Sequence, residues 1–272
     1  MTESPILIIG STGKTGRRIV QKLREQGFRI REGSRHSQPV FDWTDPVTWP
    51  AAVAGVKAAY ISYYPDLAAP GAPGTIEKLT ACAREAGVER LVLLSGRGEH
   101  NAQRCEEIVR HSGLEYTLIR SSWFAQNFSE GALLGPVLSG MVAMPADGIR
   151  EPFIDADDIA GVAVAALTDG RHAGQLYEVT GPRLMTFAEA VQEIAGAAGR
   201  EVAYQPITLD QFHTELTHEA GSEMADLLTD LCREVFDGRN ESLGDGVQRA
   251  LGRPPRDFAD FVRSAAAAGV WR

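Results

Sequence analysis

A strand, a tight turn and a helix start are encoded in residues 6–16. The segment reads Ile-Leu-Ile-Ile-Gly-Ser-Thr-Gly-Lys-Thr-Gly, so an apolar run leads into Gly10, Gly13 and Gly16, spaced three apart. Such a turn brings backbone N–H groups and a helix N-terminus up to a pyrophosphate. A side chain at Gly10 or Gly13 would obstruct the turn or the phosphate, and one at Gly16 would push the helix off the sheet. The segment predicts dinucleotide binding; the alternative is an ordinary turn between strand and helix.

Polar side chains within this loop lie where phosphates are expected. Ser11 and Thr12 separate the first two glycines, Thr12 and Thr15 add hydroxyls, and Lys14 adds a cation at the mouth of the turn. A nucleoside-triphosphatase loop needs four residues between its glycines and then Gly-Lys-Ser/Thr, which this loop lacks. We therefore expect the whole segment 10–16 to bind a dinucleotide.

The cofactor type is predicted from the end of the second expected strand, residues 28–33. Ser34 and Arg35 follow this strand, and Glu32 falls inside it. A carboxylate near this position usually binds the ribose 2′-hydroxyl of NAD, whereas a guanidinium suits the 2′-phosphate of NADP. Lys14 and Arg35 together indicate NADP(H), with Arg35 as a solvated loop residue the alternative. Glu32 leaves NAD(H) possible if the strand ends earlier.

Composition limits the classes of partner. The 272 residues carry a formal charge of −9, which disfavours nucleic acid as a partner. No apolar run approaches the ~20 residues that a membrane span needs, and the first residues show no export signal. The sequence therefore predicts a cytoplasmic protein with a small-molecule substrate, either a monomer or a homodimer.

The cysteines and histidines do not form a recognisable site in the sequence. Cys82, Cys105 and Cys232 are far apart and match neither a disulfide framework nor a metal knuckle. The six histidines show no metal-binding spacing. No metal is expected.

Apolar runs alternate with helical stretches in the first half, which predicts an α/β fold: a Rossmann-type, doubly wound parallel sheet. The expected strands are 5–9, 28–33, 58–62, 90–94, 116–119 and 175–179, with helices at 75–86 and 102–111. Beyond these, Thr186 and Thr208 each begin a capping box that predicts a helix. Helices are also expected at 222–235 and 258–267, and a short strand at 202–206.

Two units follow from this order of elements. Residues 1–125, with 151–182 returning to them, are expected to form the dinucleotide-binding domain. Residues 126–150 and 183–272 are expected to form a smaller C-terminal α/β lobe that binds the substrate.

Six segments give the chain a resemblance to a known family. It resembles the NmrA-like branch of the atypical short-chain dehydrogenases and is similar to the ergot-alkaloid (agroclavine and festuclavine) dehydrogenase group. The matching segments are 10–16, 41–49, 91–95, 115–128, 152–160 and 252–261. The resemblance implies a Rossmann-type domain, NADPH as cofactor, Asp42 on the adenine side, and reduction of an imine, iminium ion or conjugated double bond. This chain departs from the family at Ser121-Ser122, where Pro followed by Thr or Gly is usual, so the floor of the site differs.

Ligands of such a sheet bind at the carboxyl ends of its strands. This rule adds Ser62, Tyr63, Ser95 and Ser122 to the expected cofactor contacts. Ordinary short-chain dehydrogenases use a Tyr-x-x-x-Lys pair, whose lysine lowers the tyrosine pKa. The expected helix 102–111 contains neither residue type, which indicates hydride delivery to an acceptor that needs little acid help.

Three residues are candidates for local chemical assistance. Ser95 ends a central strand, although a strand-end hydroxyl also binds backbone. His100 could donate a proton near neutral pH, although a loop histidine is often only solvated. Tyr63 could stack on cofactor or substrate, or pack at the sheet edge.

An aromatic cluster predicts the substrate pocket. Trp123, Phe124 and Phe128 lie near Asn127, and they line either an apolar pocket over the nicotinamide or the seam between the two units. We expect Met144 and Phe153, with Met141, to complete the wall. The leading hypothesis is an NADPH-dependent reductase; the alternatives are a non-catalytic NADP(H) sensor and a non-redox isomerase on the same scaffold.

Overall fold

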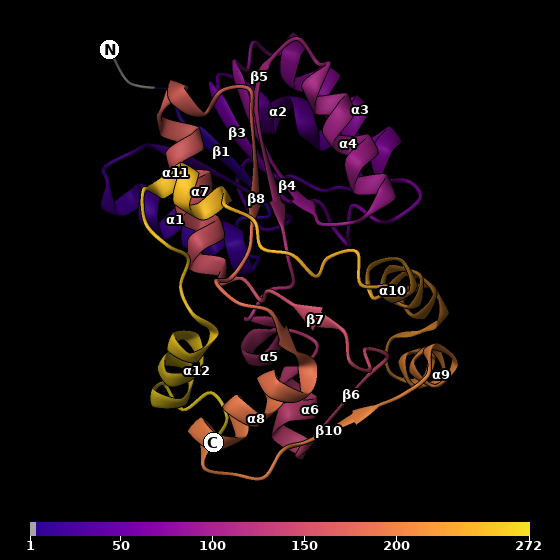
Figure 1. Cartoon of the computed structure of the whole chain (residues 1–272). Coiled ribbons are helices and arrows are strands. Elements are labelled where there is room, and N and C mark those ends of the chain that lie inside the picture. The colour runs from indigo at the N-terminus through magenta and orange to yellow at the C-terminus, as the bar shows by residue number, and fades with distance from the viewer. Residues whose placement is uncertain (1–3) are drawn as a thin grey trace.

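The computed structural model describes residues 4–272 and is built on a six-stranded parallel sheet (Figure 1). Its strands, in spatial order, are β2 (Ile30–Gly33), β1 (Ile6–Ile9), β3 (Ala58–Ile61), β4 (Arg90–Gly96), β5 (Glu115–Ser121) and β8 (Gln175–Val179). The chain leaves β1 toward β2 and then returns to β3 on the other side, so the strand order reverses beside β1. Ligands of open α/β sheets bind at such a reversal. The expected Rossmann-type sheet is confirmed.

Helices cover both faces of the sheet because its strands alternate two sets of apolar side chains. Leu7 and Ile9 face one core, and Ile6 and Ile8 face the other. The first core packs under α2 (Trp49–Val53), α3 (Ala72–Glu85) and α4 (His100–Arg110). The second packs under α1 (Lys14–Glu25), α7 (Ala156–Thr168) and α11 (Gly246–Leu251). Figure 1 shows these two groups on opposite sides of the strands.

The second half of the molecule lies beyond the carboxyl ends of the strands (Figure 1). Four helices and two short sheets surround one core of buried apolar side chains. The helices are α5 (Asn127–Glu130), α6 (Leu134–Ser139), α8 (Phe187–Ala198) and α12 (Phe258–Ala267). The sheets pair β6 (Met141–Met144) with β10 (Ala203–Pro206) in parallel, and β7 (Arg150–Glu151) with β9 (Met185–Thr186) in antiparallel. A helical hairpin of α9 (Leu209–Ala220) and α10 (Ser222–Val235) lies beside them.

Local sequence signals fixed several element boundaries. The capping boxes at Thr186 and Thr208 are both formed, and they begin α8 and α9. The elements β8, α10 and α12 occupy the residues expected for them. β4 continues two residues further than expected, to Gly96, because it pairs with β5 as far as Ser121. α11 packs against α7 and β8, so this part of the segment 183–272 lies on the dinucleotide-binding half.

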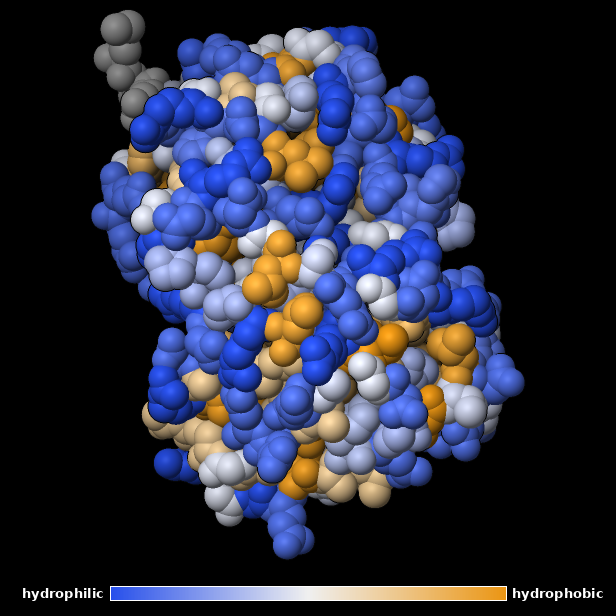
Figure 2. All heavy atoms as spheres, viewed as in Figure 1, coloured by the Kyte–Doolittle hydropathy of each residue, from blue (hydrophilic) through white to orange (hydrophobic). Residues whose placement is uncertain are grey.

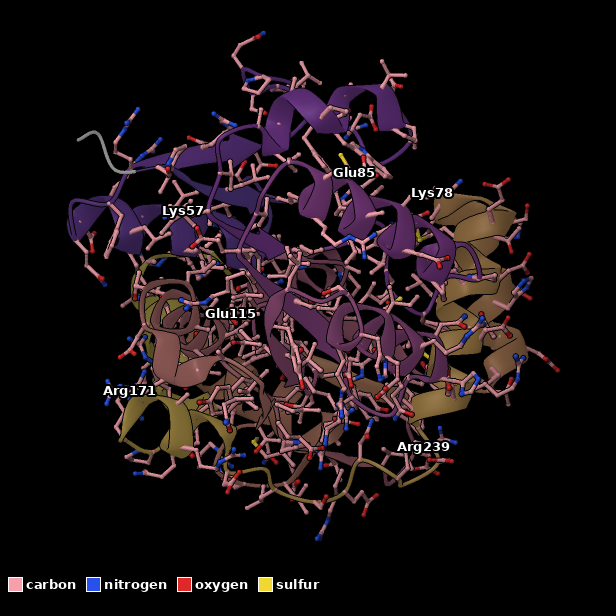
Figure 3. All side chains as sticks on the ribbon, turned by 90° about the horizontal axis from the view of Figure 1, so that it is seen from above. Lys57, Lys78, Glu85, Glu115, Arg171 and Arg239 are labelled. Atoms are coloured by element: carbon pink, nitrogen blue, oxygen red, sulfur yellow. The ribbon has the colours of Figure 1, made fainter. Side chains whose placement is uncertain are left out.

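The face of the molecule drawn in Figure 2 is mostly hydrophilic, with scattered hydrophobic patches. Figure 3 labels Lys78 and Glu85 on α3, Glu115 at the start of β5, and Arg171 in the short helical turn before β8. Figure 2 shows the outline of the molecule narrowing between its two halves. Among residues 4–272, no helix is long and apolar enough to cross a bilayer. Residues 1–3, at the start of the stretch searched for an export signal, lie outside the described part of the chain.

Candidate functional site

The glycine loop between β1 and α1 forms an anion-binding turn. Gly10 has φ of 79°, a conformation that favours glycine. A Cβ on Gly16 would lie 2.1 Å from the carbonyl oxygen of Gly10, so only glycine permits this contact between helix and strand. Gly13 is the N-cap of α1 and offers no side chain to the first N–H groups of the helix. These groups are therefore available to a pyrophosphate, as the dinucleotide interpretation requires.

The polar residues of this loop divide into two groups. Thr12 is exposed at the tip of the loop, and Lys14 lines the adjoining cleft. The Thr15 hydroxyl accepts a buried 2.8 Å hydrogen bond from the Tyr60 hydroxyl. Thr15 also lines the cleft, and its own O–H remains a donor for the expected phosphate contact. The Ser11 hydroxyl is buried and has no hydrogen-bond partner among the described residues. Burial lowers the pKa of Lys14.

The end of β2 separates the two residues that could select the cofactor. Glu32 lies inside β2, and its carboxylate accepts a 2.6 Å hydrogen bond from Arg24 on α1. Arg35 follows the strand and is exposed. Ser34 lies between them, and its hydroxyl accepts a hydrogen bond from the backbone N–H of His36. Beyond the strand end, the Arg35 guanidinium has no hydrogen bond or ion pair among residues 4–272, and its charge lowers the pKa of Asp42. The Glu32 carboxylate, in contrast, is paired with Arg24.

Asp42 and Tyr63 lie near the same end of the sheet. They are connected by Trp43, which follows Asp42 in the chain and packs against Tyr63. The Asp42 carboxylate accepts hydrogen bonds from the backbone and side chain of Thr44, which lower its pKa. The Trp43 ring lies edge-on to Tyr63, with ring centroids 4.8 Å apart. Trp43 also contacts Phe41 and Trp49 in the core under α2. The aromatic packing fixes the wall on which Tyr63 faces the cleft.

A cleft of about 1170 Å³ lies between the two halves of the molecule. It brings together several predicted residues from distant parts of the chain: Lys14, Thr15, Ser62, Tyr63, Ser95, Ser122, Trp123, Phe124, Asn127, Met141 and Met144. The opposite wall comes from the α9–α10 hairpin through Phe212, Leu216, Leu228 and Leu231. α9 has no fully buried residue, so its apolar side chains remain available to a ligand.

Two residues expected in the pocket lie elsewhere. Phe128 and Phe153 are 0% and 2% exposed, and their rings pack against each other in the core of the second half. They are absent from the lining of the cleft. Apolar residues of α9 and α10 provide the wall that these rings were expected to form. Trp123 and Phe124 do line the cleft, and Trp123 also stacks on Phe236.

Two of the predicted hydroxyls are held by interior acceptors. The Ser95 hydroxyl donates a 2.7 Å hydrogen bond to the Glu106 carboxylate, which also accepts from Arg120. The Ser122 hydroxyl donates a 2.6 Å hydrogen bond to the backbone oxygen of Pro152. Both residues line the cleft, and these bonds engage their hydroxyl protons. A catalytic role for Ser95 stays a prediction, with only its hydroxyl oxygen left to accept a hydrogen bond.

His100 is also displaced from the expected site. It begins α4, it is exposed, and its backbone N–H donates a 2.7 Å hydrogen bond to Glu234. It is not among the residues that line the cleft. Tyr63 is therefore the catalytic candidate that the structure leaves with its ring at the cleft.

Sequence reasoning missed two carboxylic acids of the cleft, Asp66 and Glu99. They lie in the loops after β3 and β4, on the same sheet edge as Ser62 and Ser95. The carboxyl-end rule selected this edge, but nothing in the local sequence shows that two loops 33 residues apart place their acids together. Among the described residues, no group of three or more His, Cys, Asp or Glu is arranged to hold a metal ion.

Comparison with known proteins agrees with this geometry. A family model described as NAD(P)H-binding matches residues 10–170. An NAD(P)H azoreductase of Xenophilus azovorans is 30% identical, over 97% of this chain and 98% of its own length. An agroclavine dehydrogenase of Claviceps fusiformis is 30% identical, over 94% of this chain and 96% of its own. The second relative confirms the resemblance to the agroclavine dehydrogenase group.

Solved structures share the fold. An NADPH-dependent quinone oxidoreductase of Escherichia coli, complexed with NADPH, has a TM-score of 0.76 and 21% identity, covering 95% of this chain and 99% of that one. A nucleoside-diphosphate-sugar epimerase of Staphylococcus aureus has a TM-score of 0.81 and 18% identity, with the same coverage. At these identities the likeness concerns the fold alone.

Proposed function

The chain belongs to the NAD(P)H-binding family, and from this premise we propose that it is an NADP(H)-dependent oxidoreductase that transfers hydride to a small hydrophobic imine, iminium ion or conjugated acceptor. The observation that carries the proposal is the side-by-side placement of the uncapped α1 N-terminus and a large cleft with apolar walls. The first suits a pyrophosphate and the second suits an apolar organic acceptor.

The cofactor side of the proposal depends on three features of the chain. The backbone N–H groups after Gly13 and the Lys14 ammonium would hold the pyrophosphate. Arg35 would bind the 2′-phosphate of NADP(H), since the Glu32 carboxylate is engaged by Arg24. Reduced NADP, when bound, supplies the hydride.

The acceptor side depends on shape and exclusion of water. Trp123 and Phe124 at the carboxyl end of β5 face Phe212 and Leu216 on α9 across the cleft. Such walls hold an apolar acceptor close to a hydride donor, and proximity alone can lower a bimolecular barrier by about 7–11 kcal/mol. One relative is named an NAD(P)H azoreductase and another an agroclavine dehydrogenase; the first name, which denotes reduction of a nitrogen–nitrogen double bond, supports a nitrogen-containing acceptor.

Turnover of a panel of imines, iminium salts, enones and quinones tests the proposal. We expect NADPH absorbance to fall with at least one nitrogen acceptor, and to fall more slowly with NADH at equal concentration. As a control, Gly13→Asp would place a carboxylate in the expected phosphate site and abolish turnover. NADPH binding without consumption of any acceptor would favour a sensor, and product formation without net NADPH consumption would favour an isomerase; either result contradicts the proposal.

A further inference from the structure

A pair of carboxylic acids lines the cleft at the carboxyl ends of neighbouring strands. Asp66 follows β3 and Glu99 follows β4, and their carboxyl groups lie within hydrogen-bonding reach of each other. Glu99 is only 8% exposed, and its Oε2 atom has no hydrogen-bond partner among the described residues. A buried carboxyl oxygen without a partner needs either a proton or a ligand.

The surrounding backbone holds this pair in place. The Glu99 carboxyl folds back over Gly96, where an added Cβ would lie 1.8 Å from Oε1 and 2.2 Å from Oε2. Asp66 accepts a 2.8 Å hydrogen bond from the backbone N–H of Ala68. The side chain of Asn101 on α4 in turn donates a 2.9 Å hydrogen bond to the Ala68 oxygen. Both loops are therefore fixed with their acids facing one another at the cleft.

The charges around the pair favour a bound proton. Two carboxylates in hydrogen-bonding contact cannot both ionise without strong repulsion. Glu234 on α10 and Glu106 on α4 add negative charge around Glu99. The neighbouring guanidinium of Arg97 is directed elsewhere, to Glu178 and to the backbone of Asn240.

The same environment shifts the titration of both acids. Burial, followed by the charge of Asp66, raises the pKa of Glu99 well above its usual range. Burial also raises the pKa of Asp66, and this effect outweighs its hydrogen bonds, which lower the pKa. Two buried carboxyl groups in contact therefore favour a state in which the pair shares one proton and keeps one negative charge.

We propose that the Asp66–Glu99 pair is the proton donor of the reaction and that it directs the enzyme to acceptors with a basic nitrogen. This inference rests on the proposed function and supplies the acid that the absent Tyr-Lys pair would otherwise provide. It also names the substrate class, since the remaining negative charge stabilises a cationic nitrogen and not a developing oxyanion.

The chemistry balances with groups already assigned. The shared O–H bond breaks as its proton forms an N–H bond with the imine nitrogen. The hydride from reduced NADP forms the new C–H bond at the imine carbon, so the imine is reduced to an amine and NADPH is oxidised to NADP⁺. The carboxylate pair then regains a proton from solvent through the open cleft.

Two acceptors separate proton donation from hydride transfer. A neutral cyclic imine needs both a proton and a hydride, whereas an N-methyl iminium salt needs only the hydride. We expect Glu99→Gln to lower kcat for the imine by about 100-fold or more, as general acids typically contribute, and to change kcat for the iminium salt by only a few-fold. Glu223→Gln, at an exposed acid of α10 that does not line the cleft, should leave both rates near wild type.

Several outcomes would overturn the inference and are distinct from failure of the proposed function. Equal losses for both acceptors in Glu99→Gln would assign the residue a structural role, and no loss would remove it from the reaction. Wild-type protein that reduces neither acceptor would refute the proposed function itself. Independently of turnover, the infrared difference spectrum of wild type minus Glu99→Gln should show a protonated carboxyl band at neutral pH, because the buried Glu151 contributes equally to both proteins and cancels. A difference spectrum without this band would refute the shared proton.

Discussion

Glu151 on β7 makes stability depend on pH in a direction that can be measured. Its side chain is 0% exposed, and neither carboxylate oxygen has a hydrogen-bond partner among the described residues. Burial raises its pKa from 4.5 to about 8, against the attraction of Arg97 and with added repulsion from Glu241. The folded state therefore holds a proton over a pH range in which the unfolded state has lost it.

The sign and size of the effect follow from this shift. Below the pKa that Glu151 has in the unfolded state, the carboxyl is protonated in both the folded and the unfolded state. In that range it does not make the unfolding free energy depend on pH. Between 4.5 and about 8 the unfolding free energy falls as pH rises, by about 1.4 kcal/mol per pH unit. Above the pKa of Glu151 in the folded state, the loss of unfolding free energy reaches its full size. This loss is at most about 5 kcal/mol, because relaxation of the folded state reduces it.

The substitution Glu151→Gln removes this titration and isolates its contribution. We expect the unfolding free energy of the variant, relative to wild type, to rise by several kcal/mol between about pH 5 and about pH 8.5 in urea denaturation. Any pH-independent cost of the buried amide cancels in this difference. Glu77→Gln, at an exposed position of α3, is the matched control. Its unfolding free energy relative to wild type should be the same at both pH values. Parallel stability curves for Glu151→Gln and wild type would refute the reasoning.

Five further substitutions, among them the control Gly74→Ala, test other parts of the structure. Gly16→Ala should lower the melting temperature in calorimetric scans and abolish NADPH binding, because its Cβ would lie 2.1 Å from a backbone oxygen. Gly74→Ala in α3 is the control: its Cβ meets nothing within 4 Å, so the melting temperature should stay the same or rise. Phe128→Ala should lower the unfolding free energy by about 3–5 kcal/mol, since the ring is fully buried; Phe212→Ala, at the cleft wall, should instead raise the KM for the acceptor. Arg35→Ala should weaken NADPH binding about 10- to 100-fold in titration calorimetry and leave NADH binding unchanged, because only NADPH carries the 2′-phosphate; equal losses for both cofactors would contradict its assigned role.

The sheet and the cofactor loop were predictable because their signals are local. The apolar run before Gly10 and the capping boxes at Thr186 and Thr208 each determine structure within a few residues, and they correspond to β1, α8 and α9. The contact between Gly16 and the Gly10 oxygen likewise depends on one strand and the helix that follows it.

The roles of individual side chains in the cleft depend on tertiary partners that the local sequence does not show. A strand-end serine looks the same whether it faces a ligand or, like Ser95, a buried acid such as Glu106. An aromatic residue such as Phe128 has the same local pattern in a core as in a pocket wall. Asp66 and Glu99 become a pair only when β3 and β4 lie side by side, so their juxtaposition is a property of the sheet.

Binding of the dinucleotide at the N-terminus of α1 is tested most directly by calorimetric titration of NADPH into wild type and Gly13→Asp. Gly13 has extended backbone angles of −76° and 175°, and an added Cβ would lie 3.3 Å from the Gly10 oxygen. Aspartate therefore fits after a small shift of that oxygen, and as an N-cap residue it stabilises the helix. We predict that wild type binds NADPH, and that the variant loses binding by at least about 100-fold while its melting temperature does not fall. Equal NADPH affinity in the two proteins would contradict the assignment of this helix end as the phosphate site.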